Sequence, residues 1–197
     1  MHIPAESIQV LTATRKGDTG TAALNRALQT ALNPAGAGKR EKRFGDLVFR
    51  EGDRVMQTRN DYDVVWQKED GTAGTGIFNG DVGKIAKIDP SGELLEIVFD
   101  DRTATYTSDM LAELDMAYAM TVHKAQGSEY RGVVFIGAPC APSLMVRGVL
   151  YTAITRAREL LVIVGDDSAV NKMAENDRRS RRYSGLKWRL RKGGEEK

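Results

Sequence analysis

The sequence predicts an α/β fold in which a parallel sheet flanked by helices is interrupted by a small antiparallel β-barrel. Apolar segments with strand and helix periodicity alternate near both ends of the chain, whereas the middle holds short β-like segments separated by Gly, Asp and Asn. We therefore expect residues 1–43 and 115–175 to form the α/β unit, residues 44–114 the inserted barrel and residues 176–197 a basic tail.

The α/β unit is expected to begin with a strand and a helix. The apolar segment "IQVLTAT" predicts a strand at 8–14, and "GTAALNRALQTALNP" predicts a helix that buries a stripe of Leu24, Leu28 and Leu32. Arg15 lies in the loop between them. In an open α/β sheet, the carboxyl end of a strand delivers such a loop to a crevice where ligands bind.

The middle of the chain has the texture of an antiparallel barrel. Short strand patterns are separated by "NGDVG", "DPSG" and "FDDRT", which favour tight reversals. The longer stretch "VWQKEDGTAGTG" shows no apolar period and is expected to be a hairpin or loop. The strand patterns are "DRVMQT", "YDVVW", "VGKIAKID", "LLEIVFD" and "RTATY".

The α/β pattern then resumes. Continuous apolar runs predict strands that are buried on both faces, and two amphipathic stretches predict helices. The strands are "AYAM", "GVVFIG" and "LLVIVGD", and the helices are "RGVLYTAITRARE" and "SAVNKMAEN".

Composition excludes several classes of protein. No stretch approaches the roughly 20 apolar residues of a membrane span, and no apolar signal segment follows a basic start, so a cytoplasmic location is expected. A single cysteine, Cys140, and two histidines argue against a zinc site, and no metal site is predicted. The stretch "AGAGKR" is not a phosphate loop, because Asn33 replaces the first glycine and Arg40 replaces the Ser or Thr.

Basic charge is concentrated at the C-terminus. Residues 171–197 carry 10 Lys and Arg against 4 Asp and Glu, a net charge of +6, and residues 1–170 carry 19 against 23, a net charge of −4. The tail "RRSRRYSGLKWRLRK" also contains Tyr183 and Trp188, which could stack on bases while the arginines follow a phosphate backbone. The alternative is a solvated terminal segment.

Two polar clusters are candidate sites. In "TVHKAQGSEY", Thr121, His123 and Glu129 follow the "AYAM" strand, and Gly127 permits close backbone approach. The alternative is that these residues cap a short helix or lie in solvent.

In the second cluster, "YTAITRARE", the predicted helix would turn Leu150, Ile154 and Ala157 inward. Its packing would hold Thr152 and Arg156 on a rigid face, and a fixed arginine suits the charge that develops on a transferring phosphoryl group. Arg158 and Arg147 are expected to be surface charges or partners of Glu159 and other acids.

These segments resemble helicase motifs. "AMTVHKAQGSEYRGVVFIGAP" resembles motif V of superfamily 1 helicases, "VLYTAITRARELLVIVGD" resembles motif VI, and "VLTATRKGDTGTAALNRALQ" is similar to motif IV of the RecD-like branch. The inserted segment "GDRVMQTRNDYD...GIFNGDVGKIAKID" resembles the Src-homology-3-type barrel that RecD-like enzymes carry between motifs IV and V. The three motifs stand in the family's order.

The resemblance implies the RecA-like second motor domain of an ATP-dependent 5′ to 3′ DNA helicase related to the exodeoxyribonuclease V alpha subunit. By position, Arg15 and Arg156 would be arginine fingers for the γ-phosphate, whereas Gly127 and Glu129 would face the nucleotide. The DNA contacts would come from Thr121, His123 and Thr152.

The cofactor would be ATP with Mg²⁺, held by a phosphate loop and an acidic residue that this chain lacks. Expected partners are single-stranded DNA, the N-terminal RecA-like domain and possible nuclease-complex subunits, with no membrane. Alone, the chain would be an inactive half of an ATPase, and motif IV within its first 20 residues favours a fragment. The alternative is a stand-alone, non-enzymatic single-stranded nucleic-acid-binding or adaptor module.

Overall fold

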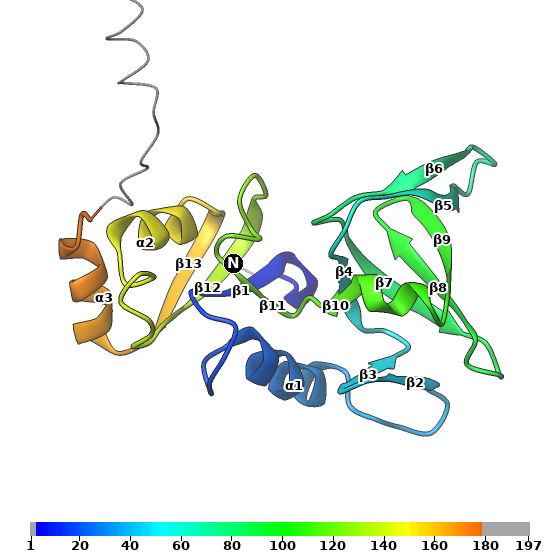
Figure 1. Ribbon diagram of the computed structural model, residues 1–197, viewed down its shortest axis with the longest axis horizontal. Helices are drawn as coiled ribbons and strands as arrows, with labels where there is room; N and C mark the ends of the chain where they lie inside the picture. Colours follow the sequence, from blue (N-terminus) through cyan, green and yellow to red (C-terminus); the bar gives the residue numbers. More distant parts are fainter. Residues whose placement is uncertain (1–2, 179–197) are drawn as a thin grey trace, which may run out of the picture.

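The computed structural model describes residues 3–178 and contains two main sheets joined side by side (Figure 1). The parallel sheet has four strands in the order β11-β1-β12-β13. Its strands are β1 (Ile8–Thr12), β11 (Ala119–Thr121), β12 (Tyr130–Gly137) and β13 (Ala157–Gly165). A short 3-10 helix, η1 (Ala5–Ser7), precedes β1. The α/β architecture predicted from the alternating pattern is confirmed.

Helices lie on both faces of the parallel sheet. Helix α1 (Thr21–Leu32) packs over β11 on one face, and α2 (Arg147–Ile154) and α3 (Asp167–Glu175) pack over β12 on the other (Figure 1). The apolar side chains of Val133 and Phe135 are buried beneath α2 and α3. In the part of the chain that the structure describes, no helix is long and apolar enough to span a bilayer.

Three predictions about these elements were wrong. Leu32 is 56% exposed, while Asn25 of α1 is buried because its side chain bonds the backbone of Met116 and Ala119. Helix α2 ends at Ile154, which is itself 39% exposed, because the chain turns there and β13 begins within the predicted helix. Strands β11 and β13 are edge strands rather than inner ones, since among the described residues β11 pairs only with β1 and β13 only with β12.

The inserted segment folds into a seven-stranded antiparallel sheet in the order β10-β4-β7-β8-β9-β5-β6. All five predicted strand patterns are strands, and "VWQKEDGTAGTG" spans the β5–β6 hairpin. The 3-10 helix η2 (Met110–Glu113) precedes the last strand. The strands are β4 (Arg54–Gln57), β5 (Asp61–Gln67), β6 (Ala73–Ile77), β7 (Val82–Ile88), β8 (Leu94–Phe99), β9 (Arg102–Thr107) and β10 (Leu114–Met116). A separate hairpin, β2 (Glu41–Phe44) and β3 (Leu47–Arg50), connects α1 to this sheet.

A hydrophobic core fills the inserted sheet. Ile85, Ile97 and Phe99 are fully buried, and the Phe99 and Tyr106 rings lie 6.0 Å apart between centroids. The turn between β7 and β8 is held by Asp89, whose carboxylate accepts the Leu94 amide at 2.9 Å. This bond and those from the hydroxyl and amide of Ser91 hold the pKa of Asp89 at about 2.

A buried polar hub joins the inserted sheet to α1. The carboxylate of Asp53 is fully buried and accepts hydrogen bonds from Gln29 at 2.6 Å, Asn33 at 2.7 Å and the Tyr118 hydroxyl at 2.8 Å. The amide of Arg50 adds a fourth bond at 2.7 Å. Burial, and then the charge of Asp53, raises the pKa of Tyr118. A buried carboxylate with four donors from three segments is expected to fix their relative orientation.

The chain returns from the inserted sheet to the parallel sheet through a short connection. Strand β10 pairs with β4 of the inserted sheet, and β11 pairs with β1 of the parallel sheet, with only Ala117 and Tyr118 between them. The domain boundaries at residues 43, 114 and 175 stay predictions.

Candidate functional site

The polar segment 122–129 connects the carboxyl end of β11 to the amino end of β12, so it crosses from one end of the parallel sheet to the other. The amide of Ala125 donates to the Thr121 carbonyl at 3.2 Å, and the amide of Lys124 donates to the Thr121 hydroxyl at 3.3 Å. Gly127 has a φ of +89°, a left-handed conformation that favours glycine, although a side chain there would meet open space.

Arg156 lies at the amino end of the sheet, in the turn between α2 and β13. Its guanidinium donates to the carbonyl oxygens of Ser128 at 2.9 Å and Thr152 at 3.2 Å, and to the Thr155 hydroxyl at 3.2 Å. Its carbonyl accepts the Tyr130 amide at 2.8 Å. The guanidinium carries more N–H donors than these bonds use. Arg156 is therefore held in place by the polar segment while keeping donors for a ligand.

Glu129 lies at the same end of the sheet as Arg156, because it immediately precedes β12. Its ion-pair partner is Arg158, which lies at the start of the neighbouring strand β13. The Arg158 Nε and Glu129 Oε2 atoms are 2.7 Å apart, with side chains 65% and 49% exposed. Exposed ion pairs contribute little to stability. The carboxylate of Glu129 can therefore exchange this partner for a ligand group at small cost.

A second cluster lies at the carboxyl end of the sheet. Arg15 is exposed in the loop after β1, and Lys124 and the buried Thr121 line the same small cavity. Burial lowers the pKa of Lys124 and the Arg15 charge lowers it further, against the opposing effect of Asp115, whose Oδ2 is 3.9 Å from Nζ. The loop is tight: a Cβ at Gly20 would lie 2.6 Å from the Arg15 backbone. Two positively charged side chains, Arg15 and Lys124, thus lie near one another at the carboxyl end of the sheet.

The structure does not bring Arg15 and Arg156 together. The last residue of β1 lies beside Ile136, and the first residue of β13 lies beside Tyr130. Six residues of parallel strand between these levels correspond to about 20 Å. Arg15 therefore shares its end of the sheet with Thr121, whereas Arg156 shares the other end with Gly127 and Glu129.

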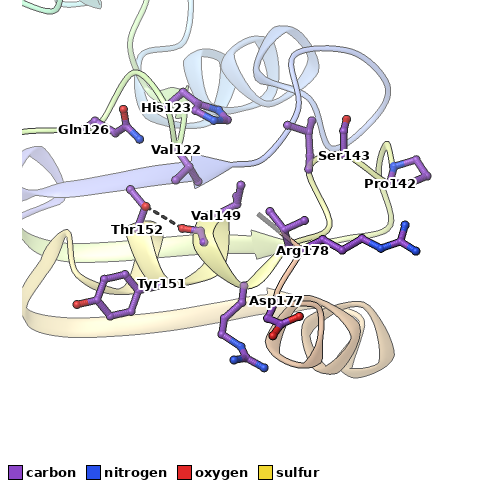
Figure 2. Close-up of a pocket in the computed structure, with 14 residues that line it drawn as sticks. Val122, His123, Gln126, Pro142, Ser143, Val149, Tyr151, Thr152, Asp177 and Arg178 are labelled. Carbon is purple, nitrogen blue, oxygen red and sulfur yellow. Dashed lines mark hydrogen bonds between the residues drawn. The ribbon is translucent and has the colours of Figure 1, made fainter. Parts of the chain in front are cut away.

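His123 and Thr152 line an open groove of about 1100 Å³ between the polar segment and α2 (Figure 2). Thr152 donates its hydroxyl to the Gly148 carbonyl at 2.8 Å, a bond within the helix. His123 is exposed at the opposite wall. The groove is also lined by Val122, Gln126, Pro142, Ser143, Leu144, Val146, Arg147, Val149, Tyr151, Asp177 and Arg178.

Sequence reasoning missed two arginines of this groove. Arg147, expected to be a plain surface charge, donates to the carbonyl oxygens of Ala174 at 2.6 Å and Glu175 at 3.3 Å and so caps the end of α3. Arg178 lies at the rim. Only their clustering with other basic residues after position 146 could have drawn attention to them.

Two further predictions concern the basic tail and the binding of a metal ion. The predicted basic tail lies outside the described residues from position 179 onward. Within residues 3–178, no group of three or more His, Cys, Asp or Glu side chains is placed to hold a metal ion.

Family comparisons agree with the two-sheet architecture. Residues 24–99 match the model of the ATP-dependent RecD-like DNA helicase SH3 domain, and residues 116–164 match the UvrD-like helicase C-terminal domain. The first match covers the expected Src-homology-3-type insertion, and that prediction is confirmed.

Whole-chain relatives are helicases. The ATP-dependent RecD2 DNA helicase of Deinococcus radiodurans is 36% identical over 89% of this chain and 22% of its own length. The RecBCD enzyme subunit RecD of Mycolicibacterium smegmatis is 31% identical over 94% of this chain and 30% of its own. The chain thus spans less than a third of these relatives.

Solved structures show the same fold. Bacteroides Pif1 bound to single-stranded DNA aligns with a TM-score of 0.53 at 16% identity, over 95% of this chain and 46% of that one. Pif1 helicase from Candida albicans aligns with a TM-score of 0.51 at 16% identity, over 96% and 50%.

Proposed function

Because this chain belongs to the RecD-like family of superfamily 1 DNA helicases, we propose that it is the second of two motor halves that hydrolyse ATP and move 5′ to 3′ along single-stranded DNA. The observation that carries the proposal is the polar segment 122–129, which links a cluster suited to a nucleotide with a cluster suited to a phosphate backbone. The two clusters lie at opposite ends of the same short sheet.

The amino-end cluster would meet the nucleotide. Arg156, fixed by Ser128 and Thr152, would direct its remaining N–H groups at the γ-phosphate, where negative charge is stabilised during transfer. Glu129 would accept ribose hydroxyls in place of Arg158. Bound ATP supplies the phosphoryl group, and its magnesium ion and the attacking water would be held by the other motor half. These residues fit one side of a nucleotide and not the whole of it.

The carboxyl-end cluster and the groove would meet DNA. Arg15 and Lys124 supply positive charge beside Thr121, and the groove adds Arg147 and Arg178. Lysine and arginine side chains gathered on one surface suit a phosphate backbone, and we expect them to bind DNA without sequence specificity. We therefore propose that Arg15 contacts DNA instead of the γ-phosphate, and the support for this is the roughly 20 Å of sheet between it and Arg156. Its expected role as an arginine finger stays a prediction.

Coupling between the clusters would run through the polar segment. A shift of Arg156 toward a γ-phosphate would pull on the Ser128 carbonyl near one end of the polar segment. The other end of the segment follows Thr121, on the side proposed to face DNA, so the pull would be passed on to it. Closure on the nucleotide would therefore change the grip on DNA. The RecD relatives are subunits of a RecBCD enzyme, so further partner subunits are part of the proposal.

The test replaces the matched region of the D. radiodurans RecD2 helicase with this chain and measures ATP hydrolysis and DNA binding. Arg156→Ala should lower DNA-stimulated hydrolysis by roughly a thousandfold or more, as expected for an arginine finger, and leave the DNA affinity measured without nucleotide unchanged. Arg131→Ala is the matched control, because Arg131 is an exposed arginine whose partner is Glu159. It should change neither quantity.

Arg15→Ala should show the opposite pattern: weaker DNA binding, a shallower salt dependence and near-normal hydrolysis at saturating DNA. Equal hydrolysis by Arg156→Ala and the parent would reject the motor assignment and favour a nucleic-acid-binding module.

A further inference from the structure

The inserted sheet reaches the amino end of the parallel sheet through one arginine. Arg54 is the first residue of β4, and its Nη1 atom donates to the Ile8 carbonyl at 3.1 Å. Its Nη2 atom donates to Oε1 of Gln9, also at 3.1 Å. Ile8 and Gln9 begin β1. Because β1, β12 and β13 are parallel, Ile8 lies at the same end of the sheet as Arg156.

The side chain of Gln9 is fixed in the interior of the molecule. It is fully buried, and its amide nitrogen donates to the carbonyl oxygens of Ala117 at 3.3 Å and Tyr118 at 3.1 Å. These two residues connect β10 to β11. The Ala117 amide donates in turn to the Arg54 carbonyl at 2.9 Å, which completes a ring of hydrogen bonds. A buried network whose polar groups are paired holds its members in one arrangement.

Ile8 carries this arrangement to β12. The register pairs Ile8 with Gly132, and a Cβ atom built at Gly132 would lie 3.1 Å from Ile8 Cγ1, which is tighter than an ordinary contact. The Ile8 side chain therefore lies directly on the backbone of β12. A displacement of Ile8 would move the first residues of β12 with it, because packed interiors leave no room for independent movement.

The first residues of β12, and the polar segment just before them, hold Arg156. The Tyr130 amide donates to the Arg156 carbonyl at 2.8 Å, and the Arg156 guanidinium donates to the Ser128 carbonyl at 2.9 Å. The pairing of β12 with β13 shifts register between Tyr130 and Gly132, next to the turn that contains Arg156. Residues 128–130 therefore fix Arg156 to the sheet at a point where the regular ladder is interrupted.

Tyr130 lies close to both arginines. Burial raises the pKa of its phenol, and the neighbouring Ser128 side chain and the positive charges of Arg54 and Arg156 oppose that rise. Burial lowers the pKa of Arg54. A buried guanidinium is costly unless it is hydrogen-bonded, and Arg54 meets this requirement with acceptors on β1. One charge from the inserted sheet and one from the candidate site thus face the same phenol.

We infer that Arg54 of the inserted sheet is a positioning residue for Arg156. It acts through Ile8 and the start of β12, so the position of the inserted sheet sets the position of the guanidinium that meets the γ-phosphate. This inference rests on the proposed function and adds regulation to it. A ligand that displaced the inserted sheet would change the rate of ATP hydrolysis through Arg54.

The first test needs no ATP hydrolysis and uses the 197-residue chain. Arg54→Met removes both donors and keeps an unbranched apolar side chain. Hydrogen exchange measured by nuclear magnetic resonance should become faster by about tenfold or more at the Tyr130 amide and at the Arg156 Nε–H. These groups donate to the carbonyl oxygens of Arg156 and Thr152. The amide of Ile97 in the inserted sheet reports whether the variant is folded.

Two variants control this test. Arg59→Met changes an exposed arginine just beyond the same strand and should leave both exchange rates unchanged. Ile85→Val trims a fully buried residue of the inserted sheet, so it lowers stability without touching Arg54, and it should also leave both rates unchanged.

A milder variant keeps the test decisive if Arg54→Met does not fold. Arg54→Lys retains the positive charge but loses the planar fork of donors. It should therefore speed up exchange at the Tyr130 amide and the Arg156 Nε–H in the same direction as Arg54→Met, by a smaller factor.

The second test uses the D. radiodurans RecD2 helicase in which this chain replaces the matched region. Arg54→Met should lower kcat for DNA-stimulated hydrolysis by roughly 10- to 100-fold, because a misplacement of about 1 Å can cost about 100-fold. The KM for ATP should change little, since the lost interaction belongs to the transition state. The double variant with Arg156→Ala should be no slower than Arg156→Ala alone, because Arg54 acts only through Arg156.

Three results would overturn the inference. The first is unchanged exchange at Tyr130 and Arg156 in folded chains that carry Arg54→Met or Arg54→Lys. The second is a normal kcat for Arg54→Met in a helicase that Arg156→Ala inactivates. The third is an additive loss in the double variant, which would give Arg54 a role independent of Arg156. If Arg156→Ala leaves hydrolysis unchanged, the motor proposal fails, and the exchange rates alone decide the role of Arg54.

Discussion

The two sheets of this molecule differ in how completely they bury their apolar side chains. In the inserted antiparallel sheet, Ile85, Ile97 and Phe99 are fully inaccessible, whereas in the parallel sheet Val162 and Val164 are 39% and 51% exposed. Among residues 3–178, the inserted sheet therefore encloses a buried core, although Val65 and Leu94 of its strands stay exposed, whereas β13 of the parallel sheet keeps a run of exposed apolar side chains. Under the proposed function, a motor half that faces another domain would keep such apolar surface.

The largest expected difference in stability between the two sheets comes from truncating one apolar strand residue in each. Phe99→Ala should lower the free energy of unfolding by about 3 to 5 kcal/mol, because it empties a fully buried site. Val162→Ala should cost less than about 0.5 kcal/mol, because the side chain is partly in water. Urea unfolding of both variants measures the two costs. Similar costs would mean that β13 is buried in solution.

An intermediate effect is expected from Asp53→Asn, which would test whether the two sheets are fixed to one another. Asparagine places an NH₂ group among four donors, so the free energy of unfolding should fall by roughly 2 to 4 kcal/mol. Asp46→Asn, at an exposed turn, is the control and should be neutral. Thermal unfolding followed by two probes, one in each sheet, should also lose coincidence. A single unchanged transition would contradict the role of Asp53 as a hub.

The smallest effect concerns the turn of Asp89. Its pKa is lowered from 3.8 to about 2, so its hydrogen bonds stabilise the fold above pH 3.8, and this contribution is lost as the pH falls toward 2. Asp89→Asn should flatten the acid limb of the stability curve in that window. Glu93→Gln, in the same turn, should leave it unchanged. Unfolding measured at several pH values between 2 and 5 checks the difference, and equal acid limbs for Asp89→Asn and the parent would refute it.

The fold was largely predictable because local patterns agreed with the final structure. Alternation and turn residues marked five of the seven strands of the inserted sheet and the reversal at Asp100, whose φ is +52°, but not β6 or β10. The end of α2 was not predictable, since neither glycine nor proline separates Ile154 from β13. The continuous apolar run of β13 indicated burial on both faces of the strand. Among the described residues, however, its side chains Leu160, Val162 and Val164 are 39 to 51% exposed.

The site was only partly predictable. Motif order predicted Arg156 and Glu129 as site residues, and the structure places Arg156 against the polar segment to which Glu129 belongs. Their roles stay predictions. Sequence spacing could not show that Arg15 lies at the other end of the sheet, because that separation depends on strand direction and register. Nor could it show the role of Asp53, an ordinary turn residue in the sequence whose side-chain partners come from two distant segments, one at α1 and one at Tyr118.

The passage from β10 to β11 has a mechanical consequence. Strand β10 is bonded to the inserted sheet and β11 to the parallel sheet, and two residues, Ala117 and Tyr118, connect them. Tension on the inserted sheet along this chain would load the β10–β4 hydrogen bonds in shear, because antiparallel bonds lie perpendicular to the strands. The same tension would reach Thr121 through a single taut stretch of backbone. Drag on the insertion would thus be transmitted to the carboxyl end of the parallel sheet, which the proposed function assigns to DNA.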